Sequence, residues 1–142
     1  MRIAIYQFQN APGGCPSCNQ AGNQMIAIGR ESCQTKAREL FGDQCEFIFY
    51  LDRSESRLTG DDIHNVKNRP RFLSMLEDIK NGEIDVVMMT YMGDLSIEEE
   101  FIIAFYRYLK DHGVKLVTAR HIFFIKYTTT QKKEDCMLYI IP

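Results

Sequence analysis

The sequence predicts an α/β fold, a three-layer sandwich in which helices cover both faces of a mainly parallel sheet. Patterns typical of strands and helices alternate four times along the chain, as expected when crossover helices connect parallel strands. The run from Ile84 to Met89 is apolar except for Asp85, which fits a central strand covered on both faces. Because the chain has 142 residues, we expect one domain, 1–142, with a core over 1–120 and an antiparallel hairpin over 121–142.

Two strands and a helix are predicted before the middle of the chain. Residues 2–8 are mostly apolar and predict the first strand. Residues 10–24 contain Gly, Pro and Asn and predict a loop. A helical pattern then covers 24–41, and the aromatic and β-branched residues of 45–51 predict the second strand. The polar stretch 52–67 predicts a long loop, and loops of this length are usually functional.

A helix followed by a buried strand organises the next part of the chain. Pro70 suits the first turn of a helix, where its missing N–H is no loss. Asn81-Gly82 ends that helix, and residues 84–89 predict the third strand. Enzymes with such sheets place their chemistry just past the carboxyl ends of the strands, which here means residues 90–96. The apolar face of the helix is predicted to comprise Phe72, Leu73, Leu76 and Ile79.

The last predicted elements are a capped helix, a short strand and the hairpin. Ser96 and Glu99 have the spacing of a capping box, Gly113 ends the helix, and residues 114–118 predict the fourth strand. The hairpin over 121–142 is rich in Ile, Phe, Met and Leu. It either extends the edge of the sheet or pairs with another chain.

The composition restricts the possible functions. The formal net charge is -2, so the chain as a whole has no basic footprint of the kind typical of nucleic-acid-binding proteins. No apolar run approaches the length of a membrane span, and we expect a cytoplasmic location. Five cysteines, an odd number, indicate free thiols. Cys15 and Cys18 form a CxxC pair, but no second pair or nearby His completes a zinc site, so we expect no metal and no cofactor.

Three segments resemble a known family. YLDRSES, NRPRFLSMLEDIKNGEIDVVMMT and YLKDHGVKLV are similar to the catalytic domain of serine site-specific recombinases, the resolvases and invertases, and most of all to the large serine recombinases of mobile elements. The resemblance implies a sheet flanked by helices and assembly as dimers or tetramers on DNA. It also implies strand cleavage through a serine–phosphate bond without a metal ion.

The catalytic pattern that the resemblance implies is degenerate in this sequence. The first strand of the family reads Tyr-x-Arg-x-Ser, with the serine as nucleophile. Here the same register gives Tyr6, then Phe8 in place of the arginine and Asn10 in place of the serine. After the third strand the family has Asp-Arg-Leu, a small residue and Arg. The corresponding positions here include Gly93, Asp94 and Ile97, so both arginines are replaced.

Four family positions are retained, namely Tyr6, Asp52, Ser56 and Arg69. The chemistry of phosphoryl transfer needs a nucleophile and cations around the transferred phosphate. An asparagine at the nucleophile position cannot form a phosphoester, and Asp94 would repel a DNA phosphate. We therefore predict a recombinase-like domain that does not cleave DNA. It would act by association with DNA or protein, as a homo-oligomer or in a mixed assembly with an active recombinase.

Two other functions remain open from the sequence. The first is an active recombinase domain with a displaced nucleophile, for which Ser17, Ser32 and Ser54 are the candidates. The second is a small domain that binds an anionic ligand at the strand ends. Candidate phosphate-binding residues near the predicted helix N-terminus, where backbone N–H groups favour anions, are Lys67, Arg69 and Arg71; the competing interpretation is an ordinary solvated helix start.

Overall fold

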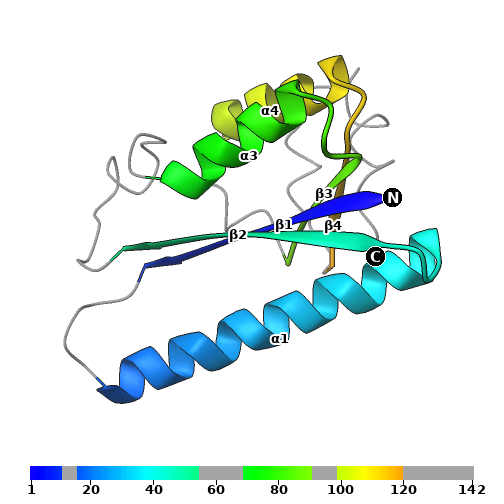
Figure 1. The fold of residues 1–142 in the computed structure, drawn as a ribbon. Coiled ribbons are helices and arrows are strands. Elements are labelled where there is room, and N and C mark those ends of the chain that lie inside the picture. The colour runs from blue at the N-terminus through cyan, green and yellow to red at the C-terminus, as the bar shows by residue number, and fades with distance from the viewer. Residues whose placement is uncertain (11–15, 55–68, 91–98, 120–142) are drawn as a thin grey trace.

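A sheet of four parallel strands forms the centre of the molecule (Figure 1). The structure is a computed structural model, and it describes residues 1–10, 16–54, 69–90 and 99–119. The strand order is β2-β1-β3-β4, and every pairing is parallel. The strands are β1 (Arg2–Asn10), β2 (Glu46–Ser54), β3 (Val86–Met89) and β4 (Lys115–Thr118).

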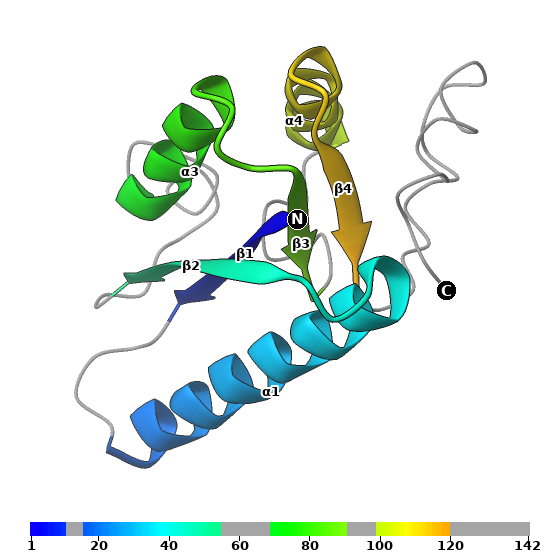
Figure 2. The ribbon, with the colours of Figure 1, turned by 45° about the vertical axis from the view of Figure 1, so that its right-hand side comes forward.

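Helices cover both faces of this sheet (Figures 1 and 2). Helix α1 (Pro16–Phe41) crosses one face, while α3 (Pro70–Lys80) and α4 (Glu99–Asp111) lie side by side on the other. The predicted three-layer sandwich with a parallel sheet is therefore confirmed. The predicted hairpin over 121–142 and the Ser96 cap lie outside the described residues.

Alternation along β1 divides its side chains between the two helical layers, since successive residues of a strand point to opposite faces. Ile3 and Ile5 join the core under α1, whereas Ala4 and Tyr6 join the core under α3 and α4. All four are fully buried. The β3 strand is buried at every position, as its apolar sequence predicted.

The α3 helix begins as predicted, with Pro70 in its first turn. Its buried face differs from the prediction, however. Phe72 and Ile79 are buried as expected, but Met75 is fully buried and Leu73 is 42% exposed. Spacings of three and four residues place Phe72, Met75 and Ile79 on one stripe of the helix, and Leu73 falls beside that stripe.

The α1 helix is longer than predicted, because it begins at Pro16 within the stretch predicted as a loop. Gly22, in the stretch predicted as a loop, and Gly29, in the predicted helix, are positions of close packing. A Cβ atom on Gly29 would lie 2.8 Å from Gln7 Nε2 and 2.9 Å from Thr90 Oγ1. A Cβ atom on Gly22 would meet the side-chain amide of Gln9. Glycine thus lets α1 lie close to the ends of the central strands.

The β2 strand also extends beyond its predicted end, through Asp52 and Arg53 to Ser54. These residues are polar, but their backbones pair with β1 in the register Phe8↔Asp52 and Asn10↔Ser54. Pairing with a neighbouring strand therefore overrides the local sequence pattern. Among the described residues, no helix combines the length and hydrophobicity needed to cross a membrane.

Candidate functional site

A buried carboxylate connects β1, β2 and the start of α3. Asp52, near the end of β2, is 3% exposed. Its Oδ2 atom accepts hydrogen bonds from the Tyr6 hydroxyl (3.0 Å) and the Phe72 N–H (2.9 Å). Its Oδ1 atom accepts one from the Arg71 N–H (2.9 Å). The first N–H groups of a helix have no partner within the helix, and Asp52 satisfies two of them from across the layer.

The position of this carboxylate also suits its charge. The N-terminus of a helix carries partial positive charge, which stabilises an anion placed there. The residue at the N-cap of α3, Arg69, makes no side-chain capping hydrogen bond of its own. The cap of α3 is therefore supplied by a residue that is distant in sequence, and Asp52 has a clear role in the fold.

The Arg69 side chain is buried beside this carboxylate. It is 1% exposed, and its guanidinium carbon lies 4.1 Å from the centroid of the Phe8 ring. A guanidinium over an aromatic face is attracted by the negative charge of that face, more strongly where water is excluded. Phe8 occupies the position at which the resemblance implies an arginine. At this position the chain therefore has an aromatic ring that contacts a cation, where the family has the cation itself.

Tyr6 completes the cluster. It is fully buried, and its ring packs edge-on against Phe72 with the centroids 5.3 Å apart. Burial raises the pKa of its hydroxyl well above the ordinary range. Nearby Arg69 lowers this pKa and Asp52 raises it, so the net shift is upward. Tyr6 is therefore a neutral hydrogen-bond donor to Asp52.

A second tyrosine–aspartate pair lies on the same side of the sheet. The Tyr50 hydroxyl donates to Asp78 Oδ2 at 2.5 Å, which connects β2 to α3. Burial is the main reason that the pKa of Tyr50 is raised, and Asp78 raises it further. Both tyrosines thus stabilise the fold in their neutral form.

The raised pKa of Tyr6 predicts that stability falls at high pH. The hydroxyl ionises in the unfolded chain near pH 10 but resists ionisation in the folded one, so its contribution is complete below that pH and is lost above it. In Tyr6→Phe, we expect the free energy of unfolding to fall less steeply above pH 10, by about 1.4 kcal/mol per pH unit. Urea titrations between pH 8 and pH 11 measure this difference, and parallel curves for the two proteins would contradict it.

The other face of the sheet presents a different set of polar groups near the ends of the strands. Gln7 Nε2 donates to the Ile26 carbonyl (2.9 Å), and Arg30 Nε donates to Gln7 Oε1 (3.1 Å). Thr90, which directly follows β3, is 7% exposed and lies close to Gly29. These groups hold α1 against the sheet.

Several predicted site residues fall where the structure gives no description of the side chain. Those outside the described residues are Cys15, Ser56, Lys67, Gly93, Asp94 and Ile97. Asn10 is the last residue of β1. Cys18, predicted in a loop, belongs to helix α1. Of the predicted phosphate-binding residues, Arg69 is buried and Arg71 is exposed, and their binding of phosphate stays a prediction.

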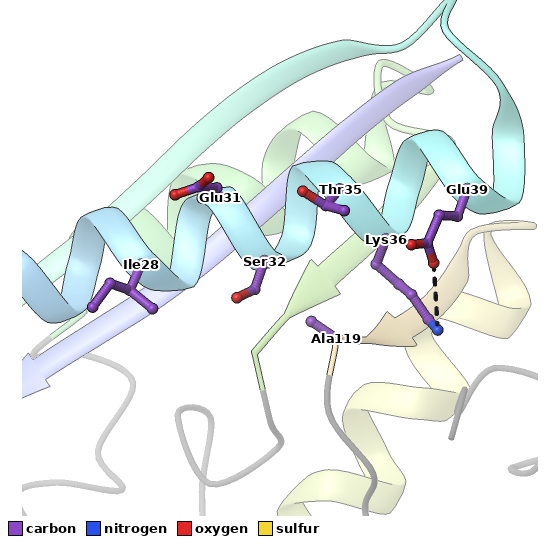
Figure 3. Close-up of a pocket in the computed structure, with 7 residues that line it drawn as sticks. All are labelled: Ile28, Glu31, Ser32, Thr35, Lys36, Glu39 and Ala119. Carbon is purple, nitrogen blue, oxygen red and sulfur yellow. Dashed lines mark ion pairs between the residues drawn. The ribbon is translucent and has the colours of Figure 1, made fainter.

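A surface hollow of about 440 Å³ lies between α1 and the residue after β4 (Figure 3). Its lining includes Ser32, Ala119 and an ion pair between Lys36 and Glu39 at 3.8 Å. The sheet separates this hollow from Tyr6, since α1 and α3 cover opposite faces (Figure 2). Within the described ranges, no three His, Cys, Asp or Glu side chains come together to hold a metal ion.

Comparisons with known proteins identify the fold. No protein-family model and no curated protein matches the chain. A resolvase family site-specific recombinase from Streptococcus pneumoniae matches with a TM-score of 0.61 and 18% identity, over 84% of this chain and 72% of that one. The N-terminal catalytic domain of TP901-1 integrase matches with a TM-score of 0.56 and 17% identity, over 84% and 77%.

A third structure extends over almost the whole chain. The C-terminal catalytic domain of ISC1926 TnpA, an IS607-like serine recombinase, has a TM-score of 0.56 and 14% identity, over 97% of this chain and 77% of that one. The chain therefore has the resolvase-like α/β fold that these catalytic domains share, as the sequence predicted.

Proposed function

We propose that this chain is a resolvase-type domain that takes part in site-specific DNA recombination without cleaving DNA. It would act by association, either with DNA or in a mixed assembly with an active recombinase. The proposal is supported by the shared fold with three recombinase catalytic domains. It is also supported by the contacts that Tyr6, Asp52 and Arg69 make within the fold.

The observation that carries the proposal is the contact between Arg69 and Phe8. Stabilisation of a transferring phosphoryl group requires cations directed at its oxygens. Arg69, the arginine retained at the described site, is 1% exposed and lies on the Phe8 ring. A guanidinium that is buried against a ring is not exposed to a phosphodiester in the solvent.

Two other retained residues, Tyr6 and Asp52, are also engaged within the fold. Asp52 accepts three hydrogen bonds, from Tyr6 and from two N–H groups of α3. An anion at the start of α3 would have to displace this carboxylate. The same geometry therefore disfavours the alternative of a small anionic ligand bound at this helix N-terminus.

The described geometry places the candidate replacement nucleophiles at different parts of the fold. Ser32 lines the hollow beside α1, on the opposite side of the sheet from Tyr6 and Asp52. Ser17 lies in the first turn of α1. Ser54, the last residue of β2, is paired with Asn10 of β1, so its backbone lies beside the expected nucleophile position. The asparagine at the expected nucleophile position, Asn10, has a carboxamide that cannot form a phosphoester.

A recombination assay tests the proposed function. The chain is incubated with a supercoiled plasmid carrying the DNA that flanks its own gene, alone and together with a serine recombinase encoded nearby. We expect no recombination by the chain alone, and a dose-dependent change in recombination when the active enzyme is present. Recombination by the chain alone would favour a displaced nucleophile. An unchanged rate in the mixture, together with no co-purification of the two proteins, would contradict the proposal.

A further inference from the structure

Three arginines and two phenylalanines of α1 and β2 are connected by contacts between these two elements. Figure 1 shows where α1 and β2 lie in the fold. The Arg30 guanidinium carbon lies 4.6 Å from the centroid of the Phe49 ring. The Arg38 guanidinium carbon lies 5.4 Å from the centroid of the Phe47 ring. Farther along β2, Arg53 donates a hydrogen bond to Asn23 of α1. We call these five residues, Arg30, Arg38, Phe47, Phe49 and Arg53, the arginine–aromatic strip.

The charged residues of the strip are all arginines. None of its arginines forms an ion pair with a described residue, as the pairs found there join Arg2 with Asp85 and Lys36 with Glu39. The acidic residues of α1, Glu31 and Glu39, both line the hollow of Figure 3, where Glu39 forms an ion pair with Lys36. The strip is thus a local basic patch in a chain whose formal net charge is -2.

The strip is accessible and its arginines are held in place. Arg38 and Arg53 are exposed and Arg30 is half-buried, and the Phe49 ring is 41% exposed. Contact with a ring fixes a guanidinium in advance, so less rotamer freedom is lost when a ligand binds. From Phe47 to Arg53 the strip extends along β2 for roughly 20 Å, given a rise of about 3.3 Å per strand residue.

We propose that the arginine–aromatic strip binds single-stranded nucleic acid. Sites for unpaired strands combine cations that follow the phosphates with flat side chains on which bases stack, and arginine planes serve as well as rings. A duplex offers phosphates but hides the faces of its bases, so the rings of the strip would have no stacking partner. The strip lies on the α1 side of the sheet and the Tyr6–Asp52 cluster on the α3 side, so this inference does not depend on the proposed function.

Fluorescence anisotropy with a labelled oligothymidylate of about 20 nucleotides, long enough for sites of this kind, tests the proposal. We expect the double variant Arg30→Gln/Arg38→Gln to bind at least about tenfold more weakly, since stacking on one base is worth that much. The slope of log affinity against log salt should decrease by about 0.7 for each phosphate that the variant no longer neutralises. Lysine at both positions should restore the salt slope without restoring the full affinity, because lysine keeps the charge but not the plane.

Arg107→Gln is the matched control, because Arg107 is an exposed arginine on α4, on the opposite face of the sheet. It should leave the affinity within about twofold, as expected for a cation that binds no phosphate. Arg30 also donates a hydrogen bond to Gln7, so Arg38→Gln and Phe49→Leu are measured separately, each with a thermal melt to confirm folding. Oligouridylate and a blunt DNA duplex are compared as ligands.

Four results would overturn the proposal. The first is no binding of the oligonucleotide by the wild-type chain at low salt. The second is an equal loss of affinity in Arg107→Gln, which would indicate general surface charge. The third is tighter binding of the duplex than of the single strand. The fourth is a change of oligomeric state in the strip variants with unchanged oligonucleotide affinity, which would identify the strip as a protein interface. A chain that binds oligothymidylate through the strip but does not alter recombination would contradict only the proposed function.

Discussion

Replacing Asp52 with alanine should lower the free energy of unfolding by about 3–5 kcal/mol. The carboxylate accepts hydrogen bonds from the Tyr6 hydroxyl and from the N–H groups of Arg71 and Phe72. Its removal leaves these three donors without an acceptor in a site where Asp52 itself is 3% exposed. An unsatisfied buried polar group costs about 1–3 kcal/mol. Urea unfolding followed by circular dichroism measures the change.

Two further variants separate the contributions to this effect. Tyr6→Phe removes one donor and leaves the carboxylate bonded to α3, so we expect a decrease of only about 1 kcal/mol. Asp78→Ala removes a carboxylate that accepts a hydrogen bond from Tyr50, and it should cost less than Asp52→Ala. If Asp52→Ala is no more destabilising than Asp78→Ala, Asp52 does not have the structural role assigned to it.

Replacing Arg69 with alanine should destabilise the fold by about 3 kcal/mol, because it leaves a cavity in place of a large side chain and removes a desolvated cation–π interaction. Arg69 is among the largest fully buried side chains, and its guanidinium lies on Phe8. Arg69→Met keeps most of the volume and should be less harmful than alanine. Thermal melts and urea titrations of both variants measure the difference.

Arg71 provides the control, because it lies on the other side of Pro70 and is exposed. Arg71→Ala should change stability by no more than about 0.5 kcal/mol. The comparison also distinguishes a structural arginine from one that contacts DNA. A stable Arg69→Ala variant with weakened DNA binding would show that this side chain leaves Phe8 to meet a phosphate.

The parts of the fold that local sequence can predict are those in which pattern and packing agree. The apolar run of β3, Pro70 at the start of α3 and Gly113 after α4 each indicate the correct element. The predicted start of α1 is wrong because the Gly, Pro and Asn residues of 10–24, Gly22 among them, have the character of helix breakers in the sequence. Gly22 instead admits the side chain of Gln9 from β1, which is a tertiary requirement. The choice of Met75 over Leu73 for the core likewise depends on how α3 is rotated against the sheet.

The residues of the candidate site can be named from the resemblance, but their contacts cannot be predicted. Tyr6, Asp52 and Arg69 come from β1, β2 and the start of α3, and only the folded chain brings them together. From the sequence alone, Phe8 is only a position at which the expected arginine is absent. The structure shows that its ring contacts Arg69. The arginine–aromatic strip is not predicted from the sequence either. The sequence features that could indicate it are the alternation of Phe47 and Phe49 in β2 and the two arginines eight residues apart in α1.

Trapping of a covalent protein–DNA adduct tests most directly whether Tyr6, Asp52 and Arg69 serve the fold alone. The wild-type chain is incubated with supercoiled DNA that flanks its gene, quenched in denaturant and analysed by mass spectrometry after nuclease digestion. If Tyr6, Asp52 and Arg69 act only in the fold, no peptide will carry a nucleotide. A nucleotide linked to a serine, and absent when that serine is replaced by alanine, would show that the domain still cleaves DNA.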